Sequence, residues 1–133
     1  MSGTEPTLVR YREVEWDAPG ASAEAAPAPP AALVEAARRT GARRKRLLRG
    51  EGGFWLNRSS MPPGFRVPPH VHDHDELLVV LAGGCRFDGG LGELGEGDAI
   101  VIRARTRYGF TCGPDGMDFL TIRSGEASVT LSE

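Results

Sequence analysis

From Phe54 onwards the chain carries short runs of Val, Ile, Leu and Phe that alternate with polar residues and are separated by turns. The turns are rich in Gly, Pro and Asp and recur about every ten residues. This pattern predicts an all-β sandwich or barrel. The runs that predict strands are 53–60, 67–72, 76–82, 84–88, 98–103, 107–112, 117–123 and 127–131.

The amino-terminal part of the chain follows other patterns. Residues 7–16 alternate well enough to predict a strand, whereas residues 19–30 are rich in Pro and Ala and predict a surface linker. Residues 30–40, which start with a proline and are followed by a glycine, predict a short helix. We therefore expect an arm, a linker and a short helix in residues 1–50.

The length of 133 residues suits one domain with a core large enough to enclose a ligand. We expect residues 51–133 to form this domain as a single antiparallel β-barrel. The sheet edges of such a barrel need cover. The predicted strand at 7–16 can cover the edge of a second subunit, which predicts a homodimer.

One pattern in the barrel region points to chemistry. It reads G-x5-H-x-H-x3-E-x6-G and consists of Gly64, His70, His72, Glu76 and Gly83. On an extended strand, the two histidine side chains leave the same face. Two imidazoles and a carboxylate suit Fe(II), Zn, Ni or Mn, and this set is usual in non-haem Fe(II) oxygenases. The alternative is a motif kept for packing, but a metal resolves the cost of burying three unpaired polar groups.

This pattern resembles the first motif of the cupin superfamily and matches each fixed position in it. The second cupin motif, G-x5-P-x-G-x2-H-x3-N, aligns without a gap from Gly97. Arg103, Arg105 and Tyr108 replace its proline, its glycine and its metal-binding histidine. The resemblance covers about residues 52–124. It implies a jelly-roll barrel with a divalent metal inside, and it leaves the fourth metal ligand open.

Tyr108 has three interpretations: a metal ligand, a catalytic acid or base, or a filler of the space that a histidine left. We favour the catalytic interpretation. We expect His74 to lie in a loop near the metal without binding it, or else to replace the missing fourth ligand. Phe110 and Cys112 share the strand parity of Tyr108, which predicts an apolar surrounding and a small apolar or aromatic substrate.

The three arginines at alternate positions, Arg103, Arg105 and Arg107, either grip an anionic substrate or face solvent. Their parity is opposite to that of Tyr108, which favours the solvent-facing interpretation. Arg66 is a weak candidate for substrate binding. The two cysteines of the chain are too few for a disulfide framework, and we expect both to be free thiols in the core.

Composition excludes several partners. With 18 acidic and 16 basic residues and a formal charge of −2, the chain offers no broad positive field for nucleic acid or anionic lipid. The basic run at 43–49 is therefore interpreted as a solvated face or a dimer-edge arm. No apolar run approaches the ~20 residues that span a bilayer, and the absence of a secretory pattern predicts a cytoplasmic protein. The preference for Arg, Ala, Gly and Pro is typical of a GC-rich bacterial genome.

These features favour a metal-dependent enzyme in which His70, His72 and Glu76 hold the metal, with Glu76 and Tyr108 in catalytic roles. An Fe(II)-dependent dioxygenase acting on a small organic metabolite is slightly favoured. The first alternative is a Zn-, Ni- or Mn-dependent isomerase, lyase or cyclase. The second is a barrel that binds or senses a small ligand without catalysis.

Overall fold

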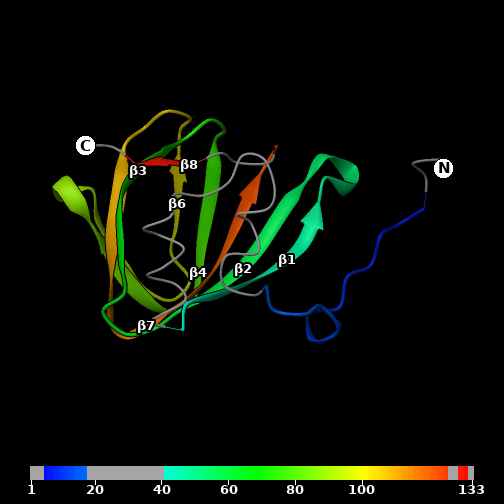
Figure 1. Cartoon of the computed structure of the whole chain (residues 1–133), viewed down its shortest axis with the longest axis horizontal. Helices are drawn as coiled ribbons and strands as arrows, with labels where there is room; N and C mark the ends of the chain where they lie inside the picture. Colours follow the sequence, from blue (N-terminus) through cyan, green and yellow to red (C-terminus); the bar gives the residue numbers. More distant parts are fainter. Residues whose placement is uncertain (1–4, 18–40, 126–128, 132–133) are drawn as a thin grey trace.

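A computed structural model describes residues 5–17, 41–125 and 129–131 of the chain, and its strands form one antiparallel β-barrel (Figure 1). All strand pairings in the described residues are antiparallel, which confirms the predicted all-β class. The strands are β1 (Arg43–Arg49), β2 (Trp55–Met61), β3 (Arg66–His72), β4 (Glu76–Phe87), β5 (Gly92–Leu94), β6 (Ala99–Ile102), β7 (Tyr108–Arg123) and β8 (Val129–Leu131).

Strand β7 organises the barrel because each of its halves pairs with a different neighbour. Its first half pairs with β3 and its second half with β2, while β4 runs beside both halves. The other pairings of β4 are with β5 and β6, and β8 lies beside β3. In Figure 1 the strands curl around one interior, with β3 and β8 on the left and β1 and β2 on the right. The barrel interior is therefore lined from β3, β4 and β7, where the sequence motifs lie.

The alternation of the long strands places apolar side chains inside the barrel. The side chains of Leu78 and Val80 in β4, and of Phe110, Cys112 and Phe119 in β7, are each at most 4% exposed. They form one continuous core with the other buried residues of the barrel. Burying this surface is the main favourable contribution to folding.

The structure corrects the predicted division of the long strands. The predicted strands 76–82 and 84–88 form the single strand β4, which ends at Phe87, and the predicted strands 107–112 and 117–123 form the single strand β7, which begins at Tyr108. The glycines between them, which we interpreted as turns, form irregularities in the pairing of β4 with β7. Gly83 adopts φ 74°, and the backbone of Gly116 leaves no room for a Cβ there. A bend inside a strand therefore has the same residue preference as a turn between strands.

The predicted strand at 7–16 is wrong. The described arm contains only the 3-10 turn η1 (Tyr11–Glu13). Its aromatic rings pack on basic side chains, since Lys45 Nζ lies 3.9 Å from the centroid of the Tyr11 ring and the Arg43 guanidinium lies 4.1 Å from that of Trp16. Cation–π contacts, and not strand pairing, therefore contribute to holding the arm on the barrel.

The basic run at 43–49 forms the strand β1, which the sequence analysis did not predict. Its charges have partners: Asp17 accepts hydrogen bonds from Arg44 Nε at 3.3 Å and from Arg46 Nε at 2.6 Å. Lys45 is 6% exposed and donates to the Tyr11 carbonyl at 2.9 Å. A strand of basic residues is stable here because the arm supplies acceptors for it.

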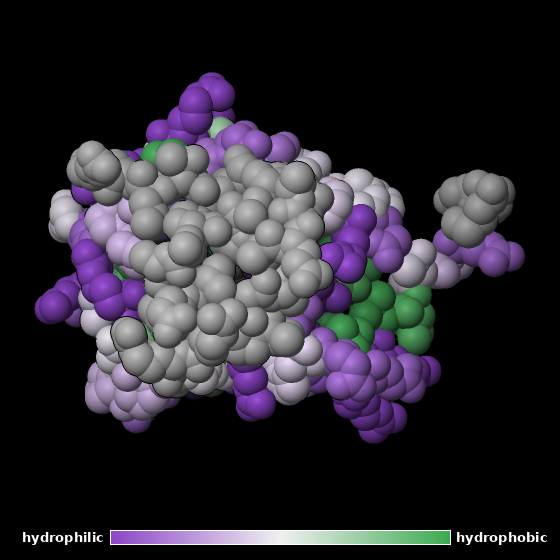
Figure 2. All heavy atoms as spheres, viewed as in Figure 1, coloured by the Kyte–Doolittle hydropathy of each residue, from purple (hydrophilic) through white to green (hydrophobic). Residues whose placement is uncertain are grey.

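The predicted linker at 19–30 and the predicted helix at 30–40 lie outside the described residues. Two further 3-10 turns follow β1 and β4, η3 (Glu51–Gly53) and η4 (Asp88–Gly90). Within the described ranges no helix is long and apolar enough to cross a membrane. Figure 2 shows hydrophobic atoms at the surface on the side where the arm lies, and Leu8 of the arm is 70% exposed.

Candidate functional site

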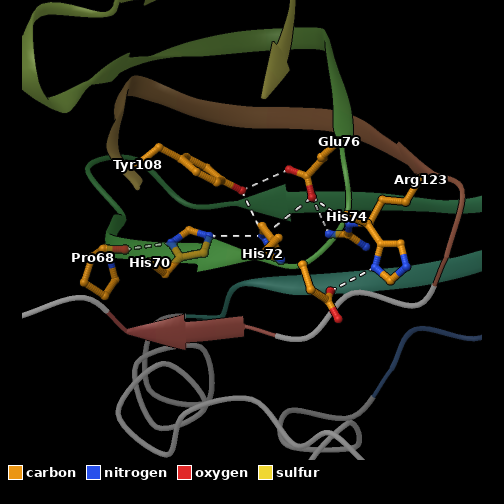
Figure 3. Close-up of polar contacts among 8 residues, drawn as sticks. Pro68, His70, His72, His74, Glu76, Tyr108 and Arg123 are labelled. Carbon is orange, nitrogen blue, oxygen red and sulfur yellow. Dashed lines mark hydrogen bonds and ion pairs between the residues drawn. The ribbon is translucent and has the colours of Figure 1, made fainter. Parts of the chain in front are cut away.

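Four polar side chains meet inside the barrel (Figure 3). His70 and His72 come from β3, Glu76 is the first residue of β4, and Tyr108 is the first residue of β7. Each is buried, with exposed fractions between 2% and 6%. His70 and Tyr108 are direct partners in the pairing of β3 with β7. Strand register therefore brings together residues that are up to 38 positions apart in the sequence.

The two histidines turn their Nε2 atoms toward each other at a distance of 3.2 Å. His70 Nδ1 lies 2.8 Å from the carbonyl oxygen of Pro68. A carbonyl oxygen only accepts, so the neutral ring carries its proton on Nδ1 and turns the Nε2 lone pair into the site. Burial lowers the pKa of His70, which favours this neutral form. A backbone carbonyl on the outer nitrogen is the usual orienting contact of a metal-binding histidine.

The Tyr108 hydroxyl lies between an imidazole and a carboxylate. It donates to Glu76 Oε1 at 3.0 Å and lies 3.0 Å from His72 Nε2. Burial raises the pKa of Tyr108 well above its ordinary value, and the nearby Glu76 charge adds to the shift. In the metal-free site Tyr108 is therefore a neutral phenol that donates its proton to Glu76 and has His72 as its second neighbour.

Arg123, the last residue of β7, holds the other oxygen of Glu76. Its Nε and Nη2 lie 2.7 Å and 2.6 Å from Glu76 Oε2. Burial opposes ionisation of Glu76, but the charges of Arg123 and His72 outweigh it and hold the pKa of Glu76 below its ordinary value. Sequence reasoning missed Arg123. The signal for it was its parity with the buried Phe119 and Thr121 on a predicted strand.

The donor chemistry of this cluster fits a divalent metal. Neighbouring ligands on one metal, each about 2.1 Å from it, lie about 3 Å apart, and the two Nε2 atoms are 3.2 Å apart. Glu76 Oε2 is 3.6 Å from His72 Nε2. In the described part of the chain, however, no group of three or more His, Cys, Asp and Glu side chains is arranged to hold a metal ion. Tyr108 and Arg123 hold the two oxygens of Glu76 in this arrangement.

His74 lies apart from the buried cluster, on the bend between β3 and β4. Its Nδ1 contacts Asp73 Oδ1 at 2.9 Å, and its side chain is 36% exposed. Arg103, Arg105 and Arg107 are exposed, as expected, but they lie on the turn between β6 and β7 and not on a strand, so the turn and not strand parity accounts for their exposure. Arg66 is also exposed, and both of its terminal nitrogens bind Asp88 at 2.7 Å.

The surroundings of Tyr108 deeper in the barrel are apolar. The Phe87 ring centroid lies 6.2 Å from that of Tyr108 and 5.4 Å from that of Phe110. Cys85 and Cys112 are buried and free, as expected. Burial raises the pKa of Cys85 to about 11 and that of Cys112 to about 12, so both thiols stay protonated and serve as core residues.

Comparison with solved structures finds the same fold. The polyketide cyclase RemF from Streptomyces resistomycificus is 25% identical with a TM-score of 0.68, covering 97% of this chain and 89% of that chain. KdgF from Halomonas sp. is 19% identical with a TM-score of 0.64, covering 92% of this chain and 96% of that one. An RmlC-like cupin from Shewanella frigidimarina is 17% identical with a TM-score of 0.65, covering 90% of each chain. Because KdgF and the RmlC-like cupin are less than 25% identical to this chain, these two comparisons show a similar fold only.

No curated protein sequence matches the chain. The family model described as the cupin domain matches residues 57–123. This range contains His70, His72, Glu76, Tyr108 and Arg123, and it is about half of the chain. The chain therefore belongs to the cupin family.

Proposed function

We propose that the protein is a metal-dependent enzyme that moves protons in a small organic molecule during cyclisation, isomerisation or elimination. The observation that carries the proposal is the position of the Tyr108 hydroxyl, 3.0 Å from both His72 Nε2 and Glu76 Oε1. A buried phenol that donates to a carboxylate can pass its proton to that carboxylate and take it back, here beside the proposed metal ligand His72. The similarity to the polyketide cyclase RemF supports this non-redox chemistry.

His70, His72 and one oxygen of Glu76 would hold the metal. When bound, a divalent ion supplies Lewis acidity, which polarises a carbonyl oxygen of a substrate. The chain itself fixes the tautomer of His70 through Pro68 and orients Tyr108 through Glu76. The phenylalanines beside Tyr108 exclude water from its apolar side, which favours a substrate with an apolar or aromatic part.

The experiment compares the wild type with Tyr108→Phe, which removes only the hydroxyl. Zinc-loaded protein is incubated without oxygen with a panel of aromatic polyketones, and products are identified by mass spectrometry. The proposal predicts products of unchanged mass or of mass lower by one water, and a rate at least about 100-fold lower in the variant. Equal rates would remove Tyr108 from the chemistry.

A second candidate, an Fe(II)-dependent dioxygenase, is favoured by the donor set of two histidines and one carboxylate. The dependence of the reaction on O2 distinguishes this candidate from the first, because only a dioxygenase requires O2 and adds its atoms to the product. A third candidate, a non-catalytic binding barrel, is favoured by the ion pair that already satisfies Glu76. It predicts a ligand whose affinity does not change in Tyr108→Phe and which is not converted.

We also propose that the protein acts as a homodimer. Residues 5–10 of the arm are exposed and extended, and Figure 1 shows them leading away from the barrel. In the described residues β2 is the only strand that pairs with β1, and on its other edge the arm contributes the bond from the Asp17 N–H to the Arg44 carbonyl, so the arm and this edge together could meet a further chain. On the outer face of the sheet, Val101 is 61% exposed beside Leu77. A second copy of the chain could cover both the exposed arm and the exposed apolar side chains on the outer face of the sheet.

A further inference from the structure

Arg123 occupies a place that neither cupin motif covers, and its ion pair lies within the proposed metal site. We propose that Arg123 is the counter-ion of Glu76 in the metal-free protein and competes with the divalent metal for this carboxylate. In this way Arg123 weakens metal binding and keeps the metal exchangeable. The inference rests on the proposed function, because it requires that the site bind a metal.

The geometry of the pair shows why Glu76 needs a counter-ion. Glu76 is 2% exposed, and the Arg123 side chain is 13% exposed. Water is therefore a poor partner for the carboxylate, and an unpaired buried carboxylate strongly destabilises a fold. Arg123 provides two contacts to the single atom Oε2, at 2.7 Å and 2.6 Å. It carries the positive charge that this interior requires when no metal is bound.

The same contacts place Arg123 in competition with a metal. Glu76 Oε2, the oxygen that Arg123 holds, is also the oxygen 3.6 Å from His72 Nε2. A cation beside the histidines meets a carboxylate whose charge the guanidinium already offsets, and it is repelled by that guanidinium. Both effects act through a poorly hydrated interior, where charges interact more strongly than in water. Removal of the Arg123 charge should therefore tighten metal binding.

The alternative is an ordinary structural ion pair. Glu76 and Arg123 are direct partners in the pairing of β4 with β7, and opposite charges at such positions stabilise sheets. A purely structural pair predicts that its loss weakens the metal-free and metal-loaded proteins equally. Competition predicts that metal binding restores the stability that the loss of Arg123 removes, because the metal then becomes the counter-ion of Glu76.

The test uses Arg123→Met, which keeps the aliphatic stem without the charge, and Arg123→Lys, which keeps the charge. Arg66→Met is the matched control, because Arg66 forms a similar pair with Asp88 on the surface. For each protein, the Kd for Zn²⁺ is measured by competition with a chelating dye. The Tm is measured after dialysis against chelator and again with saturating Zn²⁺.

For Arg123→Met we expect a lower Tm without metal, a larger rise in Tm with Zn²⁺ than in the wild type, and a Kd at least ten-fold lower. Arg123→Lys should keep the Kd within three-fold of the wild type, and Arg66→Met should leave both the Kd and the rise in Tm unchanged. If Arg123→Met folds only with Zn²⁺, the inference is also supported.

An equal or higher Kd in Arg123→Met would overturn the inference, and so would a variant that stays unfolded in the presence of Zn²⁺. These results leave the proposed function standing as long as the wild type binds Zn²⁺. Absence of Zn²⁺ binding in the wild type and in Arg123→Met would contradict both the metal site and the role of Arg123.

Discussion

The backbone N–H of Arg105 donates a hydrogen bond to the carbonyl oxygen of His72 at 2.7 Å. This bond ties the turn of the second cupin motif to the strand that carries both histidines. To make it, Arg105 adopts φ 64°, and it is the one non-glycine residue with positive φ in the described ranges. The family has glycine at this position, and the conformation explains why.

Arg105→Gly should therefore stabilise the protein, by about 0.5–1 kcal/mol after the greater chain entropy of glycine is subtracted. The free energy of unfolding from urea titration measures the change. Thr106→Gly is the control, because Thr106 is also exposed and lacks a positive φ. The control should lose stability. A loss in both variants would mean that the backbone of Arg105 is not strained.

Gly83→Ala should destabilise the protein more than Gly89→Ala. Both glycines have positive φ, 74° and 69°, so alanine is strained at either position. A Cβ at Gly89 has open space around it, whereas a Cβ at Gly83 meets the backbone of Gly116 in β7. The two strands must therefore move apart at Gly83. We expect a loss of about 1 kcal/mol at Gly89 and at least about 3 kcal/mol at Gly83. Equal losses in thermal or urea unfolding would show that the two strands separate easily at this bend.

The metal-free protein should lose stability as the pH falls below 6.5, partly through His70. Burial lowers the folded-state pKa of His70 below 6.5. The unfolded chain therefore takes up the proton first, and stability present above pH 6.5 is lost as the pH falls toward the folded-state pKa. One proton accounts for a slope of at most about 1.4 kcal/mol per pH unit.

His70→Asn has no charge to gain and should flatten this dependence. Urea unfolding of chelator-treated protein between pH 7.5 and about 5 compares the two slopes. Parallel curves would show that His70 is protonated as easily in the folded protein as in the unfolded chain.

Leu8→Glu should shift the protein toward the monomer. Leu8 is 70% exposed on the extended arm, so the substitution costs the isolated chain little. A charge in an interface between two copies would oppose association. Sedimentation velocity at micromolar concentration should show a dimer for the wild type and a larger monomer fraction for the variant. A monomeric wild type would contradict the proposed dimer.

The sequence predicted those features of the barrel that follow from alternation. The shared face of His70 and His72 follows from strand parity, whereas the inward direction of Tyr108 follows from its alignment with the metal-binding histidine of the second cupin motif. The family pattern then supplied the arrangement of the strands. Glycines did not distinguish a turn between two strands from a bend within one strand, because both favour glycine. Gly83, for example, lies at a bend within β4.

The sequence did not reveal the features that depend on contacts between distant charges. The parity of Arg123 with Phe119 and Thr121 indicates an inward direction, but only the strand register shows that its partner is Glu76. The basic strand β1 was equally hidden, because Asp17 and Tyr11, which supply its partners, lie more than 25 residues away. Pairing of this kind has no periodic signal in a sequence.

The central claim is that the buried histidines and Glu76 bind a metal. The most direct test is elemental mass spectrometry on protein purified without a metal-binding tag, for the wild type and His72→Ala. We predict about one divalent metal ion per wild-type chain, and its loss in the variant with the fold preserved by circular dichroism. A wild type that holds no metal, and takes up none when Fe(II), Zn²⁺, Ni²⁺ or Mn²⁺ is offered, would contradict the claim.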